Sequence, residues 1–448
     1  MLTVKEAQDR VAHLTKAAKK AGADAADAIY FCDASTSVSM RLGALEDVSR
    51  SEGEGIGLRL FVGRRSASVS STDMEKAALD SLVERALAMA KEAPEDPYAG
   101  LAPEDMLMQS APQDLDLDDG SEADPQALRA RALEVEDVAR SVTGVTNSEG
   151  GSASHSRMRL AIATTTGFVG GYGTSGHSTS ASVLAGEGSD MQRDYDWHSA
   201  RHLADLRSAE DIGLEAGMRT VAKVKPGRMT SGAMPVIFDP RVGTTIIGAL
   251  TGAISGSAIT RRTSFLLDRL GEQIFAPGIT IVDDPYRIRG LRSRPFDGEG
   301  LPVRAGKLVD GGVLTTWLLD SASARQLGTT PTGHASRGIG GAPGVTTGNL
   351  HIEAGSLSPD ALIADIKQGV WVTELIGSGL NGVTGDYSVG AVGFRIDNGK
   401  RAGPVAEFTI AGNMKDIFRD LTPADDLEFL FGTNVPTLRT DSMTVASG

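Results

Sequence analysis

The sequence predicts an α+β protein in which a duplicated helix, β-meander and helix region precedes a β-rich C-terminal domain. Three observations predict this class. Apolar residues with helical and then alternating spacing occur in the same order twice within residues 1–225. From residue 226 onward, short apolar runs are separated by Gly, Pro and Asp, which is typical of strands and turns. The 448 residues, 40% of them hydrophobic, suffice for two or three folded units.

The first predicted unit spans residues 1–93. It opens with a predicted helix that Gly22 ends. The apolar stripe of this helix consists of Val4, Ala7, Val11, Leu14 and Ala18. Alternating apolar residues at 38–42 and 56–62 predict strands of a meander, and a second helical stripe follows at 74–90. The single cysteine, Cys32, falls in a predicted strand and is interpreted as a core residue. One cysteine excludes an intrachain disulfide and fits a reducing compartment.

Residues 94–123 are predicted to be an acidic, proline-rich linker. Ten acidic residues and no Lys or Arg lie between Pro94 and Pro125, so this segment carries −10 of the formal net charge of −14. Like charges and prolines favour an extended chain, and we expect a loose excursion here. The remainder is close to neutral, which argues against a nucleic-acid partner.

The second unit is predicted at residues 124–225. Asp124 and Pro125 read as the N-cap and first residue of a helix. Alternation at 158–162, a glycine-rich hairpin at 167–176 and a helical stripe from Leu203 to Ala216 follow. In the C-terminal domain, residues 226–448, a strand at 235–240 leads into a helix, Ser358-Pro359 begins another that Gly369 ends, and Asn398-Gly399 predicts a hairpin turn.

The N-terminal residues are charged and amphipathic, and no window reaches the roughly 18 uncharged apolar residues of a membrane span. We therefore expect a cytoplasmic protein without a membrane partner.

The histidines are the first candidates for metal chemistry. His198 and His202 have the spacing that places two imidazoles on one helix face, but Ser199 stands where an H-E-x-x-H zinc peptidase has its Glu. We interpret them as solvent-side residues of an amphipathic helix, with a zinc site as the alternative. The other histidines are interpreted as standing alone, without a local metal-ligand partner; they are His13, His155, His177, His334 and His351.

Further motifs give weaker signals. Ser255 and Ser257 lack the G-x-S-x-G context of a hydrolase nucleophile, and Gly53–Gly57 leads into a strand rather than a phosphate-binding helix. Two segments rich in Gly and small hydroxyl residues are either tight turns or a smooth wall that a peptide backbone can approach. Their candidate residues for a substrate wall or an interface are Thr332, Gly333, His334, Gly385, Asp386 and Tyr387.

At these segments the chain resembles the TldD/PmbA family, and within it the PmbA (TldE) branch, once labelled modulator of DNA gyrase. The matching phrases follow in order through most of the chain after residue 140. They are residues 144–150, 193–195, 235–240, 264–273, 317–321, 332–335, 383–388 and 409–416.

The resemblance implies a zinc-dependent peptidase assembly in which a TldD-type chain carries a His-Glu-x-x-x-His helix and a later Cys. At those positions this chain has Thr251 for the first His, Gly252 for the Glu and Gly256 for the second His, and residues 431–434 contain no Cys. The resemblance therefore implies a non-catalytic subunit of a heterodimeric metallopeptidase, with no metal of its own. Zinc is expected in the TldD-type partner, and unfolded peptides are the implied substrates.

Two alternatives remain open. One is a stand-alone peptide-binding or scaffold protein, or a homodimer, without a peptidase partner. The other is an independent enzyme that uses His198, His202 and a carboxylate, Asp194 or Asp196. Beside the emptied motif, Arg261 and Arg262 are expected to pair with carboxylates rather than reach to substrate.

Overall fold

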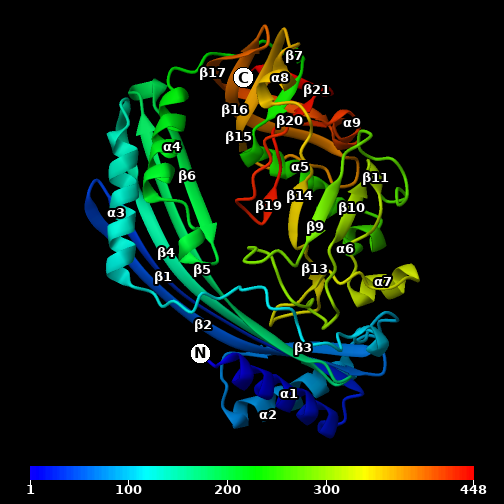
Figure 1. Cartoon of the computed structure of the whole chain (residues 1–448). Coiled ribbons are helices and arrows are strands. Elements are labelled where there is room, and N and C mark those ends of the chain that lie inside the picture. The colour runs from blue at the N-terminus through cyan, green and yellow to red at the C-terminus, as the bar shows by residue number, and fades with distance from the viewer. Residues whose placement is uncertain (448) are drawn as a thin grey trace.

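The computed structural model describes residues 1–447, and one long, curved antiparallel sheet dominates it (Figure 1). The first unit contributes α1 (Val4–Ala21), β1 (Ala25–Arg41), β2 (Ala44–Val62), β3 (Arg65–Ser71) and α2 (Lys76–Glu92). The second contributes α3 (Pro125–Ser141), β4 (Val145–Thr164), β5 (Val169–Ala185), β6 (Gln192–Ala200) and α4 (Ala209–Ala222). The predicted repetition of helix, meander and helix is confirmed.

The two meanders form one sheet of order β3-β2-β1-β4-β5-β6. The join is the antiparallel pairing of β1 with β4, from Asp27 opposite Thr164 to Met40 opposite Gly151. Backbone hydrogen bonds therefore join the two repeats into one continuous sheet. Its strands reach 20 residues and are longer than the alternating apolar segments predicted.

The strands bury both faces of this sheet. Tyr30 on β1 joins the core beneath α1 and α2, whereas its neighbour Ile29 packs with Phe296 of the C-terminal domain. The helices therefore cover one face, with α1 and α2 at one end of the sheet and α3 and α4 at the other, and the C-terminal domain lies on the opposite face (Figure 1).

The C-terminal domain confirms the predicted β-rich texture. Its eight-stranded sheet has the order β18-β20-β8-β15-β16-β17-β21-β7, with strands Thr422–Pro423, Leu438–Thr440, Val236–Phe238, Gln368–Ile376, Asp386–Asp397, Lys400–Asn413, Met443–Ser447 and Gly232–Ala233. A five-stranded sheet, β11-β10-β9-β14-β19, comprises Val313–Leu314, Gly306–Asp310, Ile281–Asp284, Asn349–Ile352 and Thr433–Asn434. Strands β12 (Ala335–Ser336) and β13 (Gly344–Val345) pair separately. The helices are α5 (Pro240–Ala253), α6 (Gly256–Thr260), α7 (Ser321–Leu327), α8 (Pro359–Ile363) and α9 (Met414–Asp420).

Two local predictions in this domain have different outcomes. The hairpin is confirmed, because Asn398 and Gly399 join β16 to β17 with φ values of 48° and 74°, as a two-residue turn requires. The helix expected from Ser358-Pro359 to Gly369 is wrong in length. Ser358 caps α8 as expected, but the helix ends at Ile363, and β15 begins at Gln368 because its apolar residues join the sheet.

The acidic segment 94–123 is not the loose excursion that its composition predicts. Leu115 and Leu117 are buried, and the carbonyl of Leu117 accepts a hydrogen bond from the Ser175 backbone on β5. The carbonyl of Leu115 accepts one from Arg289 of the C-terminal domain. Alternating apolar residues within the acidic run thus hold the segment against two parts of the protein, while most of its carboxylates stay exposed and Asp119 is largely covered.

Buried ion pairs fix the C-terminal domain on the sheet. Asp27 on β1 lies between Arg59 of β2, whose Nε donates to Asp27 Oδ2 over 2.8 Å, and Arg337 of the C-terminal domain, 2.6 Å from Asp27 Oδ1. At the other end, Lys223 lies 2.9 Å from Asp194 and 2.8 Å from Glu374 of β15. Such pairs specify one docking geometry, since each charge depends on its partners for solvation.

Asp297, in the loop that faces the sheet, gives this junction a pH dependence. Its carboxylate is buried and accepts backbone hydrogen bonds from Glu299, Leu301 and Ala335. Burial and the neighbouring Glu299 raise the pKa of Asp297 to about 7.

The folded protein therefore holds a proton on Asp297 that the unfolded chain releases near pH 4. Its contribution to stability is complete below pH 4 and is lost as the pH rises toward 7. We expect Asp297→Asn to reduce the loss of unfolding free energy between pH 4 and pH 7, measured by chemical denaturation at a series of pH values. A variant whose pH dependence equals that of the wild type would contradict this assignment.

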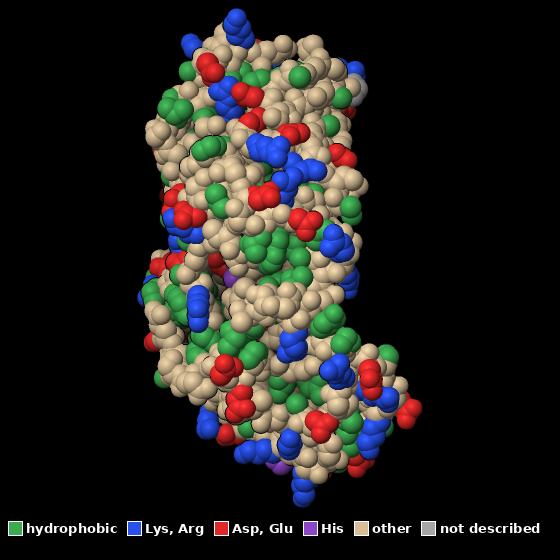
Figure 2. All heavy atoms as spheres, turned by 90° about the vertical axis from the view of Figure 1, so that its right-hand side faces the viewer, with side chains coloured by type: hydrophobic (Ala, Val, Ile, Leu, Met, Phe, Trp, Pro, Cys, Tyr) green, Lys and Arg blue, Asp and Glu red, His purple; other side chains and the backbone are tan. Residues whose placement is uncertain are grey.

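Within residues 1–447, no helix is both long and apolar enough to cross a membrane. On the face turned to the viewer in Figure 2, acidic and basic side chains are interspersed, in keeping with the near-neutral composition outside the acidic segment.

Candidate functional site

The candidate site is the helix that carries the emptied zinc motif, α5. Strand β8 leads directly into it, Asp239 caps its first turn, and Pro240 is its first residue. Its apolar side packs into the main core of the C-terminal domain through Val242, Ile246, Ile247 and Leu250. The helix is thus held firmly, and its other side carries the motif positions.

The three motif positions do not share one helix. Thr251 and Gly252 lie in the last turn of α5, which ends at Ala253, and Gly256 is the first residue of α6. The Thr251 hydroxyl donates to the carbonyl of Gly248 over 3.2 Å, and a Cβ on Gly252 would meet no atom within 4 Å. A Cβ on Gly256 would lie 2.6 Å from the Cβ of Ser323 on α7.

These residues do not fit a zinc ion. None of the three offers an imidazole, thiolate or carboxylate ligand, and the third position is closed by α7. Among residues 1–447, the group of side chains with metal-ligand character lies elsewhere in the molecule. No chemical step through zinc can therefore be assigned to α5.

The two glycines provide a matched test of this packing. Gly256→Ala is expected to lower the unfolding free energy by about 1–3 kcal/mol, since the methyl group overlaps Ser323. Gly252→Ala meets open space and should be neutral or stabilising by up to about 1 kcal/mol through helix propensity. Thermal or denaturant unfolding of both variants checks the prediction, which equal effects would contradict.

The predicted wall residues Thr332, Gly333 and His334 lie beyond α6. The backbone N–H of Gly256 donates a hydrogen bond to the carbonyl of Leu318. The next residue, Leu319, donates its backbone N–H to Thr332 Oγ1 over 2.8 Å. His334 is buried, with Nδ1 2.8 Å from Thr332 Oγ1 and Nε2 3.1 Å from Asp283 Oδ2. The imidazole is thus held by two partners, and the segment lines a pocket that also includes Asp283 and Arg304.

The second set, Gly385, Asp386 and Tyr387, lies close to α5 and to the residues that follow α6. Gly385 has φ of +85°, and a Cβ there would crowd Phe265, which follows α6. Asp386 is exposed and accepts hydrogen bonds from Thr384 and Asn413. Burial raises the pKa of Tyr387 to about 12, and its hydroxyl hydrogen-bonds Thr245 of α5. The first segment is therefore linked to α6 through Leu318 and Leu319, and the second contacts α5 and the residues after α6.

The expected helix at His198–His202 is wrong. His198 lies on β6, an edge strand, and is buried, and its Nδ1 accepts a hydrogen bond from the Arg207 backbone over 3.1 Å. His202 follows the strand, and its Nε2 contacts the carbonyl of Asp116 at 2.9 Å. Alternate side chains of β6 are buried against the sheet, and this burial favours a strand over a helix. Because His198 and His202 have separate hydrogen-bond partners, the two imidazoles do not face a common ligand.

The carboxylates of the independent-enzyme alternative are also engaged. Asp194 is buried beside Lys223 and Arg241, and Asp196 is paired with Arg207 and Arg219 at 2.8 and 2.7 Å. Both carboxylates form ion pairs that link secondary-structure elements. They do not converge with His198 and His202 on an active site.

Residues 431–434, where the resemblance places a Cys, comprise a bend followed by the two residues of β19. The Asn434 side chain accepts hydrogen bonds from the backbones of Leu430 and Phe431, and Phe431 packs on Trp197 of β6 with ring centroids 4.7 Å apart. Trp197 remains 37% exposed, so an aromatic surface persists at the sheet edge.

Comparisons with known proteins place this architecture in a family. Models of the PmbA/TldA metallopeptidase match three parts of the chain: domain 1 at residues 33–90, the central domain at 118–224 and the C-terminal domain at 231–447. The fold and the match of all three domain models in chain order define a chain of metallopeptidase type.

The chain belongs to the PmbA/TldD metallopeptidase family, on the PmbA (TldE) side. It is 38% identical to metalloprotease PmbA of Escherichia coli over 88% of this chain and 85% of that protein. A PmbA homolog of Haemophilus influenzae is 34% identical over 98% and 96% of the two chains. The solved structure of a putative modulator of DNA gyrase from Bacteroides thetaiotaomicron has a TM-score of 0.90 at 26% identity and covers both chains fully. TldE of Thermococcus kodakarensis, at 22% identity and a TM-score of 0.87, shows the fold alone; it covers 98% of this chain and 100% of that one.

Proposed function

We propose that this chain is the non-catalytic subunit of a heterodimeric zinc metallopeptidase that degrades or processes unfolded peptides in the cytoplasm. A TldD-type partner supplies the zinc and the catalytic residues. This chain shapes the chamber and holds substrate.

The observation that carries the proposal is the chemistry of α5 and α6. A zinc peptidase needs imidazole, thiolate or carboxylate ligands and a base for the bound water. Thr251 and Gly252 supply neither, and Gly256 has no room for a larger side chain beside Ser323. These departures occur inside a domain that the family model matches from residue 231 to 447.

One surface supports a role in peptide binding. Strand β6 is an edge of the long sheet and carries the half-exposed aromatic side chains of Tyr195 and Trp197. An extended peptide can add to such an edge through backbone hydrogen bonds, which favour no particular sequence. This agrees with a peptidase that accepts unfolded chains.

Arg261 and Arg262 support a contact beyond this chain. Both are exposed at the end of α6, and neither is in an ion pair with a carboxylate of residues 1–447, contrary to the expected pairing. They follow the last residue of α6, the short helix that Gly256 begins, and are free to meet an acidic group of a partner or the carboxyl terminus of a peptide.

The test is cleavage of an unfolded polypeptide by this chain alone, by a TldD-type chain from the same source alone, and by their mixture. The proposal predicts activity that requires the TldD-type chain and is lost on removal of zinc. Peptidase activity in this chain alone would contradict it. Failure of the two chains to associate, measured by light scattering, would instead favour a scaffold or a homodimer.

A further inference from the structure

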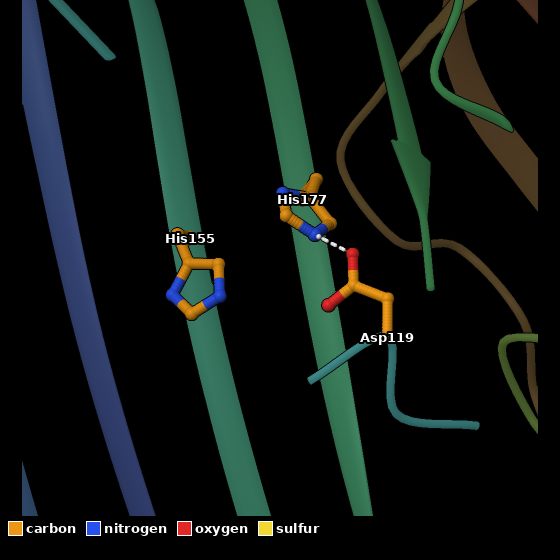
Figure 3. A group of neighbouring side chains, drawn as sticks. All are labelled: Asp119, His155 and His177. Carbon is orange, nitrogen blue, oxygen red and sulfur yellow. Dashed lines mark hydrogen bonds and ion pairs between the residues drawn. The ribbon is translucent and has the colours of Figure 1, made fainter. Parts of the chain in front are cut away.

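A cluster of metal-ligand side chains lies far from α5, on the long sheet. Asp119, His155 and His177 each offer one ligand atom, and these atoms all lie within 4.8 Å of one another (Figure 3). The sequence interpretation that His155 and His177 stand alone is wrong. The hairpin of β4 and β5 places them directly opposite each other in the antiparallel register.

The acidic segment completes the cluster. Asp119 Oδ2 is 2.8 Å from His177 Nε2, and Ser121 Oγ lies 3.2 Å from His155 Nε2 and 3.4 Å from His177 Nε2. Both Nε2 atoms and a carboxylate oxygen therefore converge on the place where the Ser121 hydroxyl sits. Ligand atoms around one zinc ion, bonded at about 2.0–2.1 Å, are spaced by roughly 3–3.5 Å, which small side-chain rotations reach from this arrangement.

The protonation states suit a cation. Burial lowers the pKa of His155, which favours the neutral imidazole. Burial acts to raise the pKa of Asp119, but hydrogen bonds from Ser121 and Leu203 outweigh it, and the pKa lies below its usual range. A neutral imidazole and an ionised carboxylate are the forms that bind metal.

Access and support are also present. His155 lines a solvent-open pocket with Thr36, Glu122 and Arg157, which gives an ion a path from the surface. The Asp119 carboxylate is oriented by the backbone of Leu203 and by Ser121, as outer partners orient the ligands of known sites.

We propose that Asp119, His155 and His177 form a binding site for a divalent cation of the zinc type, with a water or the Ser121 hydroxyl as the fourth ligand. Two imidazoles and one carboxylate suit zinc and its neighbours rather than Mg²⁺ or Ca²⁺. The ion would tie the acidic segment to β4 and β5 and so stabilise the connection between the two halves of the sheet. This site is independent of the proposed function and departs from the expectation that the chain holds no metal.

The experiment uses the full chain, free of any affinity tag and treated with a chelator. Titration with Zn²⁺ should show one ion bound per chain and a rise in the unfolding temperature. Co²⁺ as a probe should give the visible absorption of a low-symmetry nitrogen and oxygen site. Both signals should vanish in His155→Ala/His177→Ala, and Asp119→Asn should weaken binding by about tenfold or more.

The control is His13→Ala, which removes an exposed histidine outside the cluster and should leave binding unchanged. Circular dichroism establishes that each variant is folded, and Asp119→Asn tests the site even where the double histidine variant is not. Absence of stoichiometric binding in the wild type would overturn the proposal. Binding that survives in both folded cluster variants, or that His13→Ala removes equally, would also overturn it.

Discussion

Asp27→Ala is expected to lower the free energy of unfolding by about 3–5 kcal/mol, because it leaves buried charges without a partner. Asp27 lies between Arg59 and Arg337, both almost fully buried. Arg337 belongs to the C-terminal domain, so the same substitution should loosen that domain from the sheet. Chemical denaturation measures the first effect, and limited proteolysis between the domains measures the second.

The control for this prediction is Asp80→Ala, which removes an exposed ion pair between Asp80 and Lys76 on one turn of α2. Such pairs contribute about 0.5 kcal/mol or less. Similar losses in the two variants would show that the buried pairs do not fix the domains.

Gly57→Ala is the second change with a large expected effect, a destabilisation of about 1–3 kcal/mol or more. A Cβ on Gly57 would lie 2.2 Å from the carbonyl oxygen of Ile339, which is backbone and cannot rotate away. The strand β2 and the loop of the C-terminal domain would have to separate. Denaturation of the variant, and hydrogen exchange of the loop around Ile339, should both report the change.

Gly53→Ala is the matched comparison, since Gly53 lies in the same strand, is exposed and has no atom within 4 Å of its Cβ position. Both substitutions reduce the entropy of the unfolded chain alike. A Gly57 variant as stable as the Gly53 variant would mean that the two domains are not packed as described.

Much of the fold could be predicted because its signals are local. The alternation of Met158, Leu160 and Ile162, the cap at Asp124 and the Asn398-Gly399 turn each depend on neighbouring residues alone. The helix expected around His198 failed because its spacing suits a helix and a strand equally over so few residues. Burial of alternate side chains against the sheet then decided for the strand.

The acidic segment and the histidine pair were missed for a different reason. The buried positions of Leu115 and Leu117 and the convergence of Asp119 with His155 and His177 are tertiary facts. The sequence predicted the turn of this hairpin at 167–176, whereas it lies at 165–168 between β4 and β5, so the predicted register did not place His155 opposite His177. The third ligand comes from the segment before α3, and local patterns do not specify where such a segment lies.

The absence of the zinc ligands and the Glu at Thr251, Gly252 and Gly256 was inferred from the family resemblance. The structure adds a physical reason for this absence. The break between α5 and α6 after Ala253 and the close contact of Gly256 with Ser323 leave no place for a second histidine. Thr251 is already committed to the backbone of Gly248. Gly256 is therefore part of the packing against α7, whereas Gly252 faces open space.

The most direct test of the central claim is a pair of crossed mixtures assayed with an unfolded polypeptide. One combines this chain with a TldD-type chain whose His-Glu-x-x-x-His motif has been changed to alanine. The other combines the intact TldD-type chain with this chain carrying His155→Ala, His177→Ala, His198→Ala and His202→Ala, after circular dichroism shows it to be folded. The account predicts no cleavage in the first mixture and cleavage in the second, whereas cleavage in the first would place the active site in this chain and contradict it.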